Sequence, residues 1–144
     1  MDTVTKSESE TAAVAEQFAA RLQAGDTVLF YGELGAGKTT FIRSLVRHFA
    51  SDIAVSSPTF ALINVYPTNP MIYHIDLYRL ASEADLFDLG MDEYLNAGGI
   101  TLIEWAEKCG SLTPERAYAV RIAISDATER SIKIEENGYE SPGD

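Results

Sequence analysis

The sequence predicts an α/β domain with a central parallel sheet, antiparallel hairpin additions and helices on both faces. Two apolar runs, at residues 27–31 and 100–103, have the length and composition of buried strands. Residues 11–23 and 38–49 repeat apolar side chains at helical spacing, and the second segment follows a strand and a glycine-rich turn. Strands and helices that alternate along a chain favour a parallel sheet, which defines the expected fold class.

The length of 144 residues corresponds to one domain. We expect that domain to span residues 1–136 and to be followed by a flexible C-terminal tail at 137–144. Hydrophobic residues make up 46% of the chain, which is enough for a core without disulfide or metal staples. The single cysteine, Cys109, excludes an internal disulfide and a cysteine-based zinc site.

Acidic side chains dominate the charge, because 22 Asp and Glu stand against 11 Lys and Arg, for a formal net charge of -11. A field of this sign disfavours strong direct binding to nucleic acid and docking on an anionic membrane. No segment reaches the apolar length of a membrane span, and the polar, acidic N-terminus is unlike a signal or transit peptide. We therefore expect a cytoplasmic protein.

Two helices are expected in the first third of the chain. The helix at 11–23 has three candidate caps at its start, which are Ser7 paired with Glu10, Ser9 alone and Thr11 alone, and it ends at Gly25. The helix at 38–49 places one apolar face inward. The residues on that face are Phe41, Ile42, Leu45, Val46 and Phe49.

The remainder is expected to form two hairpins, a pair of short helices and one buried strand. The first hairpin turns at 67–70 and the second around 126–129, and the short helices within 81–95 lie on either side of Gly90. The buried strand at 100–103 ends at Glu104. The hairpin strands are 60–66 and 71–77 in the first hairpin, and 118–124 and 131–134 in the second.

Residues 32–39 match the phosphate-binding pattern G-x-x-x-x-G-K-[ST] of a P-loop. The glycines let the backbone curl so that its N–H groups point at phosphate oxygens, and the following helix directs its positive end at the same place. The Lys38 ammonium then reaches the β- and γ-phosphates, and the Thr39 hydroxyl ligates Mg²⁺. The motif lies in the required context of strand, loop and helix, so we expect a P-loop NTPase-like domain that binds nucleotide.

Such a site needs a second acid near the metal, and the sequence offers two. Glu104 and Asp76 each lie at the C-terminal end of an apolar strand, where ligands gather in open α/β sheets. A helix cap or an ordinary surface acid is the alternative for either residue. Position in the sequence does not separate these alternatives.

The neighbouring residues have ordinary structural explanations. His74 lies on the same face of its strand as Asp76, and a hydrogen-bonded structural histidine is the favoured interpretation. Trp105 is typical of core or rim packing, as are Tyr66, Tyr73 and Tyr78. The absence of an Asn-Lys-x-Asp motif for guanine favours ATP. The cations that could assist Lys38 are Arg43, Arg47 and Arg79.

The motifs together resemble one family, TsaE (also called YjeE), the P-loop ATPase of bacterial tRNA threonylcarbamoyladenosine biosynthesis. The resemblance covers residues 7 to 135. It rests on four segments in order: the P-loop at 32–40, Ser-Pro-Thr-Phe at 57–60, His-Ile-Asp-Leu-Tyr-Arg at 74–79 and Ile-Glu-Trp at 103–105. Ala106 departs from the family pattern, because many members carry proline there.

The resemblance implies an Mg²⁺-dependent ATPase that is weak alone and works with the proteins TsaB and TsaD. It implies that Thr39 and Glu104 hold the metal, and that Lys38, Asp76 and Glu104 are the catalytic residues. It also implies a switch-like loop at 57–59 near the γ-phosphate. The residues it implies at the nucleotide are Thr11, Gly32, Glu33, Leu34, Gly35, Ala36, Gly37, Lys38, Thr39, Thr40, Thr59 and Arg130.

Two other functions use the same loop. A small P-loop kinase normally needs an arginine-rich lid, and no arginine-rich lid segment is present in the sequence. A nucleotide-gated binding module without significant turnover needs the P-loop but not Asp76.

Overall fold

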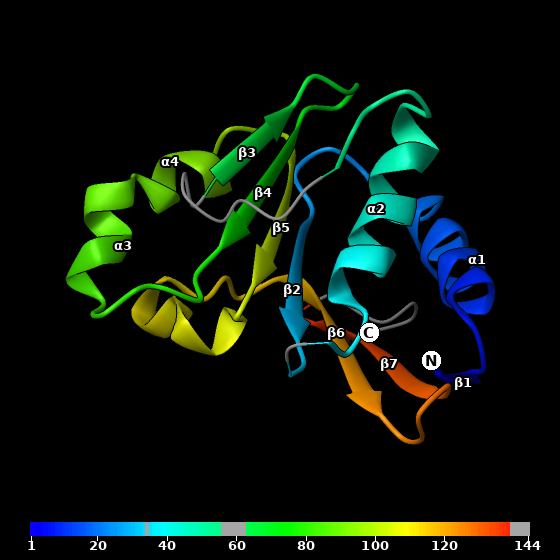
Figure 1. Ribbon diagram of the computed structural model, residues 1–144. Coiled ribbons are helices and arrows are strands. Elements are labelled where there is room, and N and C mark those ends of the chain that lie inside the picture. The colour runs from blue at the N-terminus through cyan, green and yellow to red at the C-terminus, as the bar shows by residue number, and fades with distance from the viewer. Residues whose placement is uncertain (34, 56–62, 139–144) are drawn as a thin grey trace.

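The computed structural model describes residues 1–33, 35–55 and 63–138 (Figure 1). Within these residues seven strands form one sheet in the order β1-β7-β6-β2-β5-β4-β3. The central strands β4, β5, β2 and β6 are parallel, whereas β3, β7 and β1 add antiparallel at the two edges. The strands are β1 (Asp2–Thr5), β2 (Thr27–Tyr31), β3 (Ile63–Tyr66), β4 (Ile72–Asp76), β5 (Ile100–Glu104), β6 (Ala117–Ile124) and β7 (Arg130–Asn137).

Helices cover both faces of the sheet, as the sequence predicts (Figure 1). On one face, α1 and α2 pack against each other and against β2 and β6 through Phe18 and Phe41. On the other face, the helices α3, α4 and η1 pack through the buried side chains of Leu86, Met91 and Cys109. The helices are α1 (Glu8–Ala19), α2 (Lys38–Phe49), α3 (Ala84–Leu89), α4 (Met91–Leu95) and the 3-10 helix η1 (Ala106–Leu112).

The predicted strands, hairpins and helix pairs are present among the described residues, which do not include residues 60–62 of the first hairpin. Apart from the bounds of β7, given below, there are three differences. The helix α1 ends at Ala19 rather than at residue 23, because the backbone then closes two tight turns, in which Arg21 N–H and Leu22 N–H bond the carbonyls of Phe18 and Ala19. Of the candidate caps, Ser7 is the one used, because its hydroxyl accepts a hydrogen bond from the N–H of Glu10. The other two differences are β1 and η1, which the sequence did not predict.

The strand β1 lies in the polar N-terminal segment. It pairs antiparallel with β7, and the terminal amine of Met1 donates to the carbonyl of Ile134. The strand β7 continues to Asn137, the first residue assigned from sequence to the tail, and residues 139–144 lie outside the described part of the chain. Among the described residues, no helix has the length and apolar character needed to cross a membrane.

The parallel centre of the sheet fixes where functional groups can meet. The strands β2, β4 and β5 point the same way, so their C-terminal ends share one edge. The P-loop leaves β2 at that edge, and Asp76 and Glu104 end β4 and β5 there. This edge is where open α/β sheets bind ligands.

Candidate nucleotide-binding site

The loop between β2 and α2 has a backbone that only glycine accommodates easily. Gly35 and Gly37 have φ angles of 82° and 104°, in the left-handed region that side chains disfavour. A Cβ at Gly32 would lie 2.6 Å from the carbonyl oxygen of Ile122 on β6. The turn is closed by the N–H of Ala36, which donates to the carbonyl of Glu33 at 3.1 Å. The helix α2 therefore starts at Lys38 with its N-terminus at the loop.

Lys38 is held inside the site. Its ammonium donates to the carbonyl of Gly32 at 2.6 Å and lies 4.2 Å from the centroid of the Trp105 ring. Burial lowers the pKa of Lys38, and the nearby carboxylates of Glu104, Glu107 and Asp76 oppose that shift. These two contacts are with neutral groups, so an incoming phosphate offers Lys38 a stronger partner.

The two candidate acids are adjacent. Asp76 and Glu104 are register partners on the parallel strands β4 and β5. Asp76 accepts a hydrogen bond from the N–H of Tyr78 at 2.9 Å, so it also stabilises the turn that follows β4. Glu104 is 4% exposed, and its Oε2 lies 2.7 Å from Nε2 of His74. His74 is thus a hydrogen-bonded buried histidine, as predicted, and its partner is a candidate catalytic acid.

A cavity of about 800 Å³ brings these groups together. This volume lies within the usual range for small-molecule sites, roughly 300–1,000 Å³. Three of the expected site residues belong to the loop but do not line the cavity: Gly32, Glu33 and Ala36. Leu34 and Thr59, with the rest of the predicted switch loop, lie outside the described residues. The expected site residues that line the cavity are Thr11, Gly35, Gly37, Lys38, Thr39, Thr40, Asp76, Glu104 and Arg130.

Another part of the cavity wall comes from α1, the residues just before it and the β6–β7 hairpin. Thr11 is buried, and its hydroxyl bonds that of Thr5 at 2.7 Å. Arg130 donates from Nε to the carbonyl of Ala36 at 3.0 Å and from a terminal nitrogen to that of Gly35 at 3.4 Å. Arg130 therefore braces the P-loop as well as lining the cavity.

Sequence reasoning missed part of the lining. The rings of Trp105 and Tyr78 are in tilted contact, with 5.0 Å between their centroids, and both border the cavity, where only packing was expected. A signal for Trp105 was its place directly after the strand that ends in Glu104. Of the three candidate arginines, Arg79 lines the cavity, whereas Arg43 and Arg47 do not border it. The remaining lining residues are Lys6, Ser7, Glu8, Ala127 and Thr128.

The donor set fits a magnesium ion that arrives with a nucleotide. Such an ion takes one or two carboxylates and a hydroxyl from the protein and fills its other positions with phosphate oxygens and water. Thr39, Asp76 and Glu104 line the same cavity as Lys38, so these ligand types are present beside the expected phosphate site.

Known proteins resemble this chain over most of its length. Residues 5–132 match the family model described as "Threonylcarbamoyl adenosine biosynthesis protein TsaE". A protein of Rickettsia bellii is 40% identical over 134 residues, covering 92% of each chain, and one of Treponema pallidum is 34% identical, covering 93% of this chain and 99% of its own. Both carry the name tRNA threonylcarbamoyladenosine biosynthesis protein TsaE.

A solved structure shares the fold. The crystal structure of Bacillus subtilis YdiB superposes with a TM-score of 0.80 at 29% identity, covering 96% of this chain and 86% of that chain. The family match extends from β1 into β7 and includes every element that borders the cavity. The chain belongs to the TsaE family.

Proposed function

We propose that this protein binds ATP with Mg²⁺ in the cavity and hydrolyses it slowly, in support of tRNA threonylcarbamoyladenosine modification. The observation that carries the proposal is that Lys38, Thr39, Asp76 and Glu104 line one cavity at the C-terminal edge of the parallel strands. A P-loop lysine and hydroxyl with two acids on the neighbouring strands is the set that phosphoryl transfer to water requires.

Each residue has a distinct role in the proposal. Lys38 leaves the carbonyl of Gly32 and pairs with the β- and γ-phosphates. Thr39 and Glu104 hold Mg²⁺, which neutralises charge on the phosphates. Asp76 orients the attacking water, and its bond from the Tyr78 N–H fixes the direction of its carboxylate.

The place in tRNA modification is inferred from the family. The relatives bear the name of that pathway, and the resemblance in sequence implies that TsaB and TsaD are the partners. A formal net charge of -11 favours binding to partner proteins over direct binding to tRNA. The nucleotide cycle of this subunit then acts on the partner proteins.

The test is ATP turnover with Mg²⁺, by the protein alone and with purified TsaB and TsaD. We expect slow release of ADP and inorganic phosphate alone, and faster release with the partners. A phosphorylated small-molecule acceptor formed in step with ADP would identify a kinase. ATP binding without turnover under both conditions would identify a nucleotide-gated binding module and contradict the proposed hydrolysis.

A further inference from the structure

Hydrogen bonds link three buried side chains on three neighbouring strands into a row that ends at Glu104. The Tyr66 hydroxyl on β3 lies 3.2 Å from Nδ1 of His74 on β4, and Nε2 of His74 lies 2.7 Å from Oε2 of Glu104 on β5. The strands β3, β4 and β5 are successive neighbours in the sheet (Figure 1). The side chains of His74 and Glu104 are 1% and 6% exposed, so water does not compete for these bonds.

The register of the strands brings these three side chains together. His74 pairs in register with Asn64 on β3 and with Leu102 on β5. Tyr66 and Glu104 each lie two residues beyond those partners, so both contacts run diagonally on one face of the sheet. On β5 this step leads to Glu104, at the strand end where the cavity lies.

One tautomer of a neutral His74 satisfies both neighbours. An ionised carboxylate only accepts hydrogen bonds, so Nε2 of His74 carries the proton that faces Glu104. The lone pair of Nδ1 then accepts the hydroxyl proton of Tyr66. Glu104 therefore sets the tautomer, and Tyr66 satisfies the other ring nitrogen and holds the imidazole in place.

We infer that His74, held by Tyr66, is a positioning residue that orients the Glu104 carboxylate toward the Mg²⁺ that arrives with the nucleotide. The contact occupies Oε2 of Glu104 and restrains rotation of the carboxylate, which leaves Oε1 for the metal side. Hydrogen bonds of this kind to a ligating carboxylate typically contribute about 10- to 100-fold in metal affinity or activity. The inference rests on the proposed function and adds the residue that prepares its metal ligand.

The test separates the metal response from nucleotide binding itself. In His74→Leu, the Mg²⁺ concentration that gives half-maximal turnover rises about 10- to 100-fold. Affinity for ADP in EDTA, measured by calorimetry, stays near the wild-type value because no phosphate contact is lost. His74→Gln restores much of the Mg²⁺ response, since its amide still donates to Glu104. Tyr66→Phe gives a smaller loss in the same direction.

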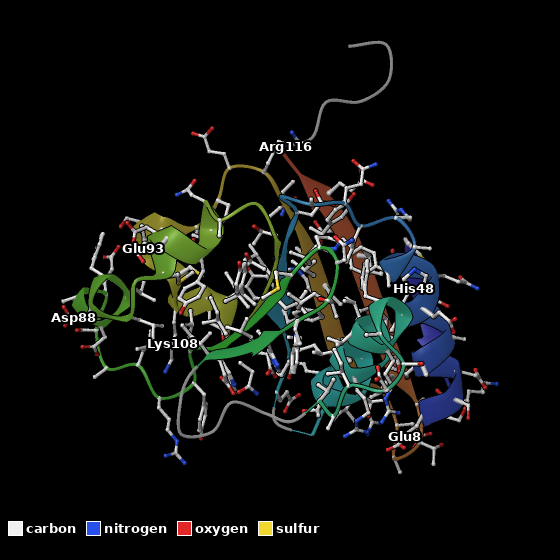
Figure 2. All side chains as sticks on the ribbon, turned by 90° about the horizontal axis from the view of Figure 1, so that it is seen from above. Glu8, His48, Asp88, Glu93, Lys108 and Arg116 are labelled. Atoms are coloured by element: carbon white, nitrogen blue, oxygen red, sulfur yellow. The ribbon has the colours of Figure 1, made fainter. Side chains whose placement is uncertain are left out.

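His48→Gln is the matched control, because His48 is exposed on α2 and does not border the cavity (Figure 2). This variant keeps the wild-type Mg²⁺ response. A wild-type response in His74→Leu would overturn the inference while leaving the proposed function intact. Parallel loss of melting temperature and of ADP affinity in EDTA, without rescue by Gln, would assign His74 a merely structural role and also overturn it.

A spectroscopic measurement covers the case in which His74→Leu does not fold. The chain has two histidines, so His48→Gln leaves the imidazole of His74 as the only one in a nitrogen NMR spectrum. We expect a protonated Nε2 and an unprotonated Nδ1, with a shift on addition of Mg²⁺ and ADP. A proton on Nδ1, or no response to Mg²⁺, would overturn the inference. Absence of Mg²⁺-dependent binding and turnover in the wild type would instead refute the proposed function first.

Discussion

The ammonium of Lys38 lies 4.2 Å from the centroid of the Trp105 ring and donates to the carbonyl of Gly32. Trp105 follows Glu104 directly and has a φ angle of 57°, in the left-handed region that non-glycine residues rarely occupy. This conformation aims the ring at the lysine that the P-loop motif assigns to the phosphates. A cation–π contact contributes about 0.5–2 kcal/mol, which is weak enough for a bound phosphate to replace.

The fluorescence of Trp105 should therefore report nucleotide binding. The chain has one tryptophan, so every change in indole emission belongs to this position. We expect a saturable change on titration with ATP, because the Lys38 ammonium leaves the ring when it pairs with phosphate. Lys38→Ala should start from a different emission and show no saturable change. An unchanged emission at concentrations where calorimetry shows bound ATP would contradict this account.

The affinity for nucleotide should fall as pH rises. The fall should begin at a lower pH than it would if Lys38 had the pKa of an ordinary lysine. Burial lowers the pKa of Lys38, so its charge is fully present at low pH and is lost as pH rises through that lowered pKa. Above it, affinity falls by about tenfold per pH unit until the pKa of the nucleotide complex is reached. Calorimetric titration of ADP across this range measures the slope.

Lys38→Arg is the matched control for the pH experiment, because arginine keeps its charge throughout. Its affinity should stay level over the same range, whatever its absolute value. Burial raises the pKa of the Cys109 thiol to about 11, so this thiol stays protonated below that pH and does not account for a fall in affinity there. The same slope in wild type and in Lys38→Arg would attribute the pH effect to another group.

Removing either acid should separate binding from turnover. Asp76→Asn and Glu104→Gln keep the shape of the cavity and are expected to lower the turnover rate by about 100-fold or more. Nucleotide affinity in EDTA should change little, because Lys38 and the loop backbone remain. Glu107→Gln removes a carboxylate that also acts on Lys38 but does not border the cavity, and it should keep turnover. Normal turnover in both acid variants would refute the site assignment.

The packing behind the P-loop should contribute strongly to stability. Phe41 on α2 is fully buried, with its ring 5.7 Å from that of Phe30 and 6.1 Å from that of Phe18. Phe41→Ala should lower the free energy of unfolding by about 3–5 kcal/mol in a urea titration. Phe87→Ala is the control, because Phe87 is 56% exposed and its loss should cost under about 0.5 kcal/mol. Equal losses in both variants would contradict the assigned core.

Local patterns predicted the elements that carry their own signals. The strand, glycine loop and helix around Lys38 follow from apolar periodicity and from the phosphate-binding pattern, and the structure has α2 at the predicted residues. The ends of β4 and β5 at Asp76 and Glu104 follow from the apolar runs that precede them. These features depend on residues that are neighbours in the chain.

Features that depend on strand order could not be predicted in this way. The contact between His74 and Glu104 needs β4 beside β5 in one particular register, which no local pattern specifies. The bonds from Arg130 to the P-loop carbonyls need β7 on the far side of β6. The strand β1 is short and polar, and it forms only because β7 presents an edge for it.

The most direct test of the central claim is calorimetric titration of ATP with Mg²⁺ into the wild-type protein and into Lys38→Ala. We expect one saturable site in the wild type. We expect Lys38→Ala to lose about 10- to 100-fold or more in affinity, since a charge-assisted bond contributes about 1.5–3 kcal/mol. The melting temperature should confirm that the variant is folded. No binding by the wild type, or equal binding by a folded Lys38→Ala, would contradict the claim that this cavity holds a nucleotide by its phosphates.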